Sequence, residues 1–352
     1  MLLDLIKIFI PALLSFAIGI GITPILSHEL YARKMWKKSA GKGSDAPLFN
    51  KLHEHRETGT PRMGGIVIWF SATLAVFAVS AAGAIANVPL LAKLDFLSRD
   101  QTWIPLTALL IGAVIGLVDD MLEIQGIKDN RAGGLSLKKR LLIVSAVGIL
   151  LGLWFHYKLD VVSVGLPFLG ELYVGTLIVP LFVLVILAVY SGGIIDGIDG
   201  LAGGIFAVIF GAYGAIAFFQ AQINLAAFSA AVVGGILAFL WFNIPPARFY
   251  MSETGSMALT LCLSVIAFMT DSLGDGEGLF ALPLIALPLF ATSASVILQR
   301  LYRRLFGKKL FVISPLHHHF EAIGWPSYKV TMRYWVLSVI FAIIGLTLTL
   351  VS

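Results

Sequence analysis

Residues 101–120 read QTWIPLTALLIGAVIGLVDD. An uncharged and mostly apolar run, 101–118, is followed by two adjacent aspartates, Asp119 and Asp120. A helix needs roughly 20 apolar residues to cross a bilayer, and this run is close to that length. Ionisable residues at membrane depth are costly, which makes them functional candidates. The stretch therefore predicts a membrane-spanning helix whose end carries a functional pair of carboxylates.

The composition of the whole chain extends this prediction to the rest of the molecule. Of its 352 residues, 58% are hydrophobic and 13% are charged, and the mean hydropathy is +0.92. Soluble domains carry roughly 25% charged residues, so a soluble globular protein is excluded. We predict an all-α polytopic membrane protein, a single integral-membrane domain over residues 1–352 with about ten transmembrane helices. The candidate spans are 5–27, 62–85, 101–119, 138–157, 174–192, 199–218, 225–243, 256–271, 278–305 and 330–351.

The lysines and arginines are distributed unevenly among the predicted loops. Most of the 25 fall in segments 28–62, 119–140 and 300–333, which share one side of the membrane if there are ten spans. Basic loops usually face the cytoplasm, so both termini are expected outside. The net charge of +5 then reflects topology and contact with anionic membrane lipid, and gives no reason to expect a nucleic acid partner. On the outer side, β-prone runs around Gly165–Pro167 predict a small hairpin near 160–174.

Acidic residues gather at the cytoplasmic ends of the predicted spans, namely Asp119, Asp120, Asp196, Asp199 and Glu253. Asp196 and Asp199 stand three residues apart in a glycine-rich stretch, so a helix there would place both on one face. The structural alternative for this stretch is helix packing through glycine. Carboxylates that face each other repel, and a hard cation such as Mg²⁺ would offset that repulsion and bridge to substrate phosphates. The cluster predicts phosphoryl chemistry at the membrane surface.

Two further motifs lie in the loops on the same side. In Thr60-Pro61-Arg62-Met63-Gly64-Gly65, Thr60 is expected as the N-cap of the second span and Pro61 at its first helical position. A helix start of this kind also favours a bound anion. The run His317–His319 points in three directions about 100° apart if it is helical, which argues against a shared metal and favours hydrogen bonding or proton transfer to a phosphate or sugar.

Taken in order, five motifs resemble those of the polyprenyl-phosphate hexose-1-phosphate transferases: TPRMGG, VDD, DGIDGLAGG, PARFYMSETGSMAL and SPLHHHFEAIGWP. The last loop and span resemble the phospho-N-acetylmuramoyl-pentapeptide transferase branch. The resemblance covers nearly the whole chain. It implies ten transmembrane helices, a homodimer, Mg²⁺ as cofactor and a cleft facing the cytoplasm in the inner membrane. It also implies that UDP-MurNAc-pentapeptide and undecaprenyl phosphate react to give lipid I and UMP in peptidoglycan biosynthesis.

The resemblance also assigns catalytic roles. Asp119 matches the general base that deprotonates the lipid phosphate, and Asp120 supports it or binds the metal together with Asp119. Glu253 falls where the family usually has a Mg²⁺-binding aspartate. The run His317, His318, His319 matches a triple histidine near the sugar phosphate.

Substrate-binding roles follow in the same way. Asp196 and Asp199 match acidic positions of the nucleotide-binding helix, and Tyr250 falls where an aromatic ring stacks on uracil. Thr60 matches the threonine of the second-span motif, and Lys138 a phosphate-contacting lysine after the aspartate pair.

The chain departs from the family pattern at four positions. Tyr190 and Gly193 stand where the family has asparagines, Glu123 replaces a lysine, and Glu253 replaces the metal aspartate. Segment 45–53 looks more like the GlcNAc-phosphate transferase branch. The alternatives are therefore a related UDP-HexNAc-1-phosphate transferase, a non-catalytic relative or, in a different class, an ion-coupled transporter. The sequence also leaves open whether transfer is direct or passes through a covalent intermediate on an aspartate.

Overall fold

The computed structural model describes residues 1–37, 59–85, 89–98, 101–126, 134–274 and 276–352. This part of the chain is helical apart from one small sheet. Its helices are α1 (Leu2–Ala32), α3 (Ile66–Ile85), α4 (Pro89–Leu94), α5 (Trp103–Gln125), α6 (Leu137–Lys158), α7 (Ile178–Gly192), α8 (Leu201–Phe219), α9 (Ile223–Asn243), α10 (Ser252–Ser272), α11 (Gly278–Ile285), α12 (Leu287–Phe306), α13 (Leu316–Ala322) and α14 (Ser327–Val351), with short 3₁₀ turns η1 (Gly175–Leu177) and η2 (Gly193–Ile195) before and after α7.

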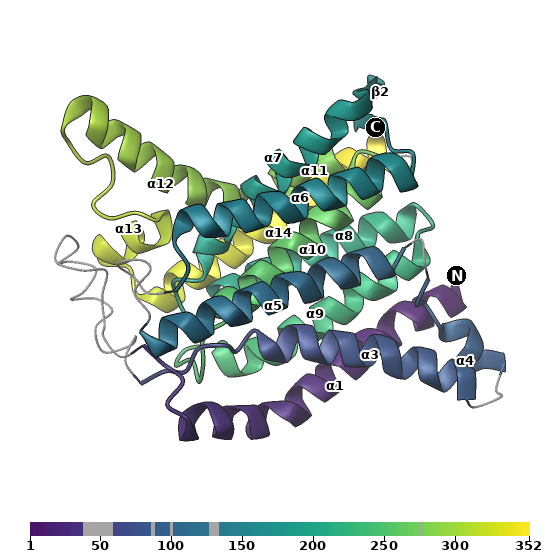
Figure 1. The fold of residues 1–352 in the computed structure, drawn as a ribbon, viewed down its shortest axis with the longest axis horizontal. Helices are drawn as coiled ribbons and strands as arrows, with labels where there is room; N and C mark the ends of the chain where they lie inside the picture. The colour runs from purple at the N-terminus through teal and green to yellow at the C-terminus, as the bar shows by residue number, and fades with distance from the viewer. Residues whose placement is uncertain (38–58, 86–88, 99–100, 127–133, 275) are drawn as a thin grey trace.

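The prediction of about ten membrane-spanning helices is confirmed. Within the described residues, 9 helices are long and apolar enough to cross a membrane, and there are 10 if α11 and α12, which meet at a 66° bend, count as one broken span. The bend lies where Pro288 enters the second position of α12. Proline lacks an N–H and its ring clashes with the preceding turn, so the span breaks there. Figure 1 shows α12 leaning away from the bundle as a result.

Helix α10 lies at the centre of the bundle, where α5, α7 and α8 pack around it (Figure 1). In the 18-residue stretch of α10 that could cross a membrane, 94% of the residues are buried, compared with 17% in the corresponding stretch of α1. The buried hydroxyls of Thr260, Ser264 and Thr270 on α10 donate to carbonyl oxygens of the preceding turn, for example Thr260 to Ser256 at 2.7 Å. These three side chains are thereby satisfied where water is absent. The first turn of this central helix is where the candidate site is built.

Helix α5 approaches α10 closely because glycines face it. A Cβ at Gly116 would collide with the backbone of Glu253 and lie 2.7 Å from Cα of Thr254. The last turns of α5, which carry Asp119 and Asp120, are therefore fixed against the first turn of α10.

We expect Gly116→Ala to destabilise the protein by about 1–3 kcal/mol, because an overpacked contact must push the two backbones apart. The matched control is Gly211→Ala on α8, where an added Cβ meets no atom within 4 Å. Thermal unfolding of the two variants in detergent checks the expectation. Equal melting temperatures for the two variants would contradict the tight contact.

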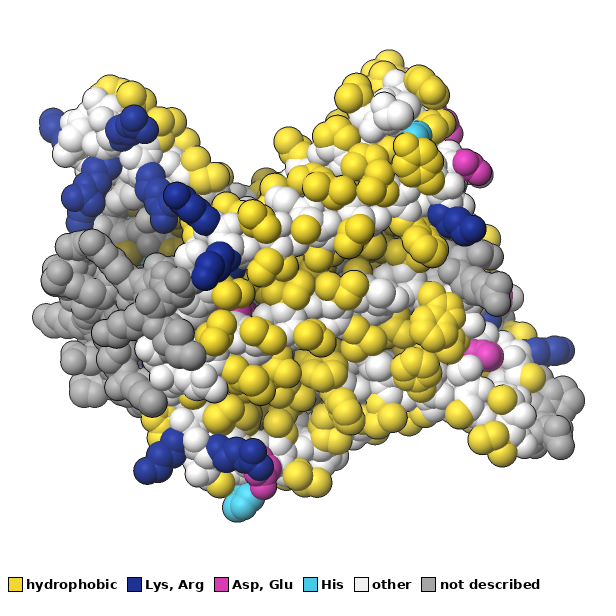
Figure 2. All heavy atoms as spheres, in the orientation of Figure 1, with side chains coloured by type: hydrophobic (Ala, Val, Ile, Leu, Met, Phe, Trp, Pro, Cys, Tyr) yellow, Lys and Arg dark blue, Asp and Glu magenta, His cyan; other side chains and the backbone are white. Residues whose placement is uncertain are grey.

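The predicted hairpin is confirmed: β1 (Ser163–Leu166) pairs antiparallel with β2 (Gly170–Tyr173). The two termini and this hairpin lie at one end of the bundle, opposite α13 (Figure 1). Figure 2 shows a broad apolar face across the helices, with most of the visible lysines and arginines gathered at the end where α12 lies. Which end faces the cytoplasm remains a prediction.

Candidate active site

Asp120 holds the N-terminus of α10 from the neighbouring helix α5. Its Oδ2 accepts hydrogen bonds from the backbone N–H of Thr254 at 2.9 Å and from the Thr254 hydroxyl at 2.6 Å, and its Oδ1 accepts from the N–H of Glu253 at 3.3 Å. The first N–H groups of a helix have no partner within the helix, and a carboxylate there also complements the helix dipole. Asp120 is fully buried, so in this arrangement it acts as the cap of α10.

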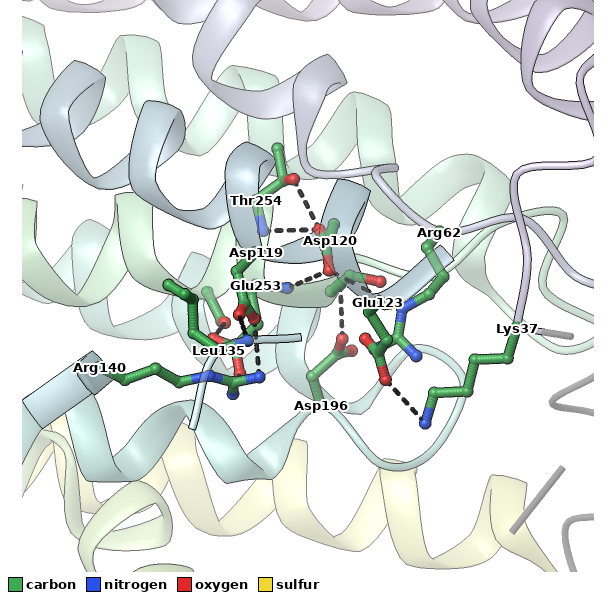
Figure 3. Close-up of polar contacts among 12 residues, drawn as sticks. Lys37, Arg62, Asp119, Asp120, Glu123, Leu135, Arg140, Asp196, Glu253 and Thr254 are labelled. Carbon is green, nitrogen blue, oxygen red and sulfur yellow. Dashed lines mark hydrogen bonds and ion pairs between the residues drawn. The ribbon is translucent and has the colours of Figure 1, made fainter. Parts of the chain in front are cut away.

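Asp119 and Glu253 are bridged by Arg140, which lies in the first turn of α6 (Figure 3). Nη2 of Arg140 lies 2.7 Å from Oδ2 of Asp119, and Nη1 lies 2.5 Å from Oε1 of Glu253. The other oxygen of Asp119 accepts the Leu135 N–H at 2.6 Å. Both oxygens of this fully buried aspartate are thus engaged.

Glu123 follows the aspartate pair by one helical turn and forms the second ion-pair group (Figure 3). Its carboxylate lies 3.0 Å from Nζ of Lys37 and 3.1 Å from Nη2 of Arg62. Nε of Arg62 also lies 3.8 Å from Asp120. Burial lowers the pKa of Arg62, but the carboxylates of Glu123, Asp120, Asp196 and Glu253 together raise it by more, so the net shift is upward and the guanidinium stays charged.

The TPRMGG motif does not begin a helix. Helix α3 starts only at Ile66, so the prediction of Thr60 as N-cap and Pro61 as first helical residue is wrong. The physical reason is that Pro61 and Gly64 instead pair with the loop before α10. The N–H of Tyr250 donates to the Pro61 carbonyl at 2.9 Å, and the N–H of Gly64 donates to the Tyr250 carbonyl at 2.8 Å. These bonds anchor the loop before α10 and place the arginine of the motif, Arg62, beside Glu123 and Asp120.

The expected helix through Asp196 and Asp199 is also absent. Residues 196–200 form a turn between η2 and α8. Asp196 accepts the N–H of Ser252 at 2.8 Å, so it too caps α10, and Asp199 accepts the N–H of Ala247 at 3.1 Å. A turn is favoured because Gly200 has φ +75, in the left-handed region that glycine tolerates.

A cavity of about 630 Å³ opens beside these groups, within the range of small-molecule sites. Its charged and aromatic lining residues are Lys37, Arg62, Glu123, Arg140, Tyr190, Asp196, Asp199, Tyr250, Glu253, Arg300 and His318. Asp119 and Asp120 do not line it. Asp119 contacts the lining residue Arg140, and Asp120 contacts the backbone of the lining residue Glu253.

The three histidines diverge, as expected from consecutive helical positions. His318 lines the cavity, and its Nδ1 lies 2.8 Å from Oε2 of Glu321. His317 is fully buried, and its ring lies against Gly197. Nδ1 of His319 accepts the N–H of Val312 at 3.2 Å. Among the three, His318 is the residue placed to meet a ligand in the cavity.

Two predicted binding residues lie away from the cavity. Lys138 is exposed and Thr60 is half-buried, and neither lines it. Sequence reasoning instead missed Arg140, Arg62 and Lys37, the three cations that pair with the acids of the site. Arg140 belongs to the same basic run as Lys138. Side chains on a helix turn by about 100° per residue, so one member of the run reaches the acids while another faces away.

Asp196 should make the stability of the protein depend on pH. Burial raises the pKa of Asp196 to about 6, although Ser252 and Arg62 act to lower it. An unfolded aspartate has a pKa of about 3.9, so the stability from protonated Asp196 is fully present below about pH 4 and is lost as the pH rises through about 6.

We therefore expect Asp196→Asn, which is neutral at every pH, to melt at a higher temperature than the wild type at about pH 8. The difference should shrink toward about pH 5. Melting temperatures measured over this range check the expectation, and a difference that is constant with pH would contradict the raised pKa.

Comparison with known proteins places this site in a family. The profile described as Glycosyl transferase family 4 matches residues 102–271. The chain is 34% identical over 302 residues to a "Phospho-N-acetylmuramoyl-pentapeptide-transferase" of Listeria monocytogenes serotype 4b, with 84% of this chain and 85% of the relative covered. A Bacillus pumilus protein of the same name is 29% identical, with 95% of each chain covered. One from Chloroflexus aurantiacus is 32% identical, with 84% of this chain and 78% of the relative covered. Since relatives above 30% identity match over most of their length, the chain belongs to the phospho-N-acetylmuramoyl-pentapeptide-transferase family and is a multi-pass membrane transferase.

Proposed function

We propose that this protein transfers phospho-MurNAc-pentapeptide from UDP-MurNAc-pentapeptide to undecaprenyl phosphate, giving lipid I and UMP in peptidoglycan biosynthesis. The observation that carries the proposal is the cavity at one end of the spans, where four cations meet four carboxylates. The cations are Lys37, Arg62, Arg140 and Arg300, and the carboxylates are Glu123, Asp196, Asp199 and Glu253. Such a site suits a ligand that carries both phosphates and hydrogen-bond donors.

The charged and aromatic residues of the cavity then have separate tasks. Arg62, Arg140 and Arg300 would hold the two phosphates of the nucleotide sugar, because guanidinium groups bind phosphate oxygens in pairs. The ring of Tyr250 would stack on uracil, while Asp196 and Asp199 accept hydrogen bonds from the nucleoside. His318, held by Glu321, would donate to the sugar phosphate. His317 and His319 would support the α13 turn that presents His318.

The reaction is a direct exchange of one phosphoanhydride for another. An oxygen of the acceptor lipid phosphate attacks the sugar-bearing phosphorus, the bond to the uridine-bearing phosphate breaks, and UMP leaves with the bonding electrons. Asp119 takes the proton of the lipid phosphate as general base. In the resting protein both of its oxygens are engaged and neither lines the cavity, so the Arg140 guanidinium must turn from Asp119 toward the bound phosphates before Asp119 can take the proton. Asp120 keeps the N-terminus of α10, and with it Glu253, in place.

The family resemblance implies Mg²⁺, but the carboxylates in this arrangement do not fit it. Within the described ranges, no group of three or more His, Cys, Asp or Glu side chains is arranged to hold a metal ion. The facing oxygens of Asp119 and Glu253 are taken by Arg140, and Asp120 accepts three hydrogen bonds. No step of the proposed reaction is therefore routed through a metal.

The setting of the enzyme is part of the proposal. We place it in the inner membrane with the cavity facing the cytoplasm, since basic loops usually face inward and each of the three basic segments contributes to the cavity lining, through Lys37 and Arg62, Arg140, and Arg300. We also propose a homodimer, as the resemblance implies. An ion-coupled transporter is disfavoured because such sites lie near the bilayer midplane, whereas these acids gather at one end of the helices.

UMP release by the purified protein in detergent tests the proposed function. Release is expected from UDP-MurNAc-pentapeptide, and only when a polyprenyl phosphate is present. Greater release from UDP-GlcNAc would instead support the related HexNAc-phosphate transferase. Binding of UDP-MurNAc-pentapeptide in calorimetry, without UMP release from any UDP-sugar, would identify a non-catalytic relative and overturn the proposal.

A further inference from the structure

We propose that the Arg140 guanidinium occupies the place between the Asp119 and Glu253 carboxylates where a divalent metal ion would bind, so that the guanidinium and the metal ion exclude each other. The inference takes its site from the proposed function, but it concerns the resting protein and needs no turnover to be tested. It assigns Arg140 as the positioning residue that joins the Asp119 and Glu253 carboxylates.

The geometry of the bridge is that of a fork between two acids. The two terminal nitrogens of Arg140 contact different carboxylates, at 2.7 Å from Asp119 and 2.5 Å from Glu253 (Figure 3). A planar guanidinium is suited to such paired contacts, whereas a lysine ammonium acts as a single point charge. The Arg140 side chain is only 17% exposed, so water screens this contact little.

The remaining oxygens of the two acids are engaged as well. Oδ1 of Asp119 accepts the Leu135 N–H, and Oε2 of Glu253 accepts the Ser256 hydroxyl at 3.3 Å. A magnesium ion binds oxygens at about 2.0–2.1 Å in near-octahedral geometry. To bind between these carboxylates it would have to displace the guanidinium, because two buried cations facing the same pair of oxygens repel each other.

Two of the four departures from the family pattern meet at this bridge. Glu253, which stands in place of an aspartate, reaches Arg140 from the first turn of α10. Tyr190, which stands in place of an asparagine, forms a side-chain hydrogen bond with Arg140. A third departure, Glu123, pairs with Arg62 and Lys37 on the other side of the aspartate pair. The three altered residues thus contact the two arginines and the lysine whose positive charges balance the carboxylates of the site.

Binding of Mn²⁺ alone, followed by electron paramagnetic resonance on the purified full chain, tests the inference. We expect Arg140→Gln to bind Mn²⁺ at least tenfold more tightly than the wild type, because it frees both carboxylates. Arg300→Gln is the matched control, since Arg300 lines the same cavity and is exposed. This control is expected to change Mn²⁺ affinity less than threefold.

Arg140→Lys gives a second test if the glutamine variant fails to fold. Lysine keeps the charge but cannot contact both carboxylates with a planar pair of nitrogens. The Mn²⁺ affinity of Arg140→Lys is therefore expected to lie at least threefold above that of the wild type and below that of a site without the cation. The proposal is overturned if each folded Arg140 variant binds Mn²⁺ as the wild type does, or if Arg300→Gln strengthens binding as much. Because no substrate is present, loss of the proposed transfer activity would leave this result unaffected.

Discussion

Asp119→Asn is expected to lower the rate of UMP release by about 10²–10⁴-fold, the usual contribution of a positioned general base. The amide has the same shape as the carboxylate, and its oxygen can still accept the Leu135 N–H. It cannot accept the proton of the lipid phosphate. The measurement is the initial rate of UMP release at saturating substrate, with folding checked by size-exclusion chromatography and melting temperature.

The matched control for this variant is Asp160→Asn at the opposite end of the bundle. Asp160 is exposed and has φ 52, a conformation that asparagine tolerates. The rate of UMP release by Asp160→Asn should equal that of the wild type. If Asp119→Asn released UMP as fast as this control, the assignment of Asp119 as base would be wrong.

Asp120→Asn is expected to destabilise the protein by about 3–5 kcal/mol, as for the loss of one partner in a buried charged group. The amide nitrogen would face backbone N–H groups of Glu253 and Thr254, which the carboxylate now accepts. Arg62 would also lose part of its charge balance. The measurement is the free energy of unfolding from denaturant titration in detergent.

Thr254→Val separates the parts of this network. It removes only the hydroxyl donor to Asp120, so a smaller loss of about 1–3 kcal/mol is expected. If Asp120→Asn kept wild-type stability while losing activity, Asp120 would be a catalytic group and the cap of α10 would be secondary.

The membrane fold could be predicted closely from the sequence because hydropathy alone carries it. A bilayer demands helices that satisfy their own backbone groups, so apolar length is nearly sufficient to place each span. The long apolar region 174–218 was harder. Its break at residues 193–200 follows from turn geometry around Asp196 and Gly200, not from hydropathy.

The site was only partly predictable, since its charges meet through contacts between distant segments. The sequence marked Asp196, Glu253 and His318, and these line the cavity. It could not show that Asp120 caps α10, because that bond joins residues more than a hundred positions apart. Nor could it separate Arg140 from Lys138, since only the orientation of α6 decides which side chain reaches the acids.

Isotope exchange tests the central claim, direct transfer to the lipid phosphate, most directly. Labelled UMP is incubated with the protein and UDP-MurNAc-pentapeptide, with and without polyprenyl phosphate, and label in the nucleotide sugar is measured. Direct transfer predicts incorporation only when the lipid phosphate is present, because lipid I must form before UMP can attack it. Incorporation without the lipid would mean that the protein itself carries the phosphosugar, and would contradict the account.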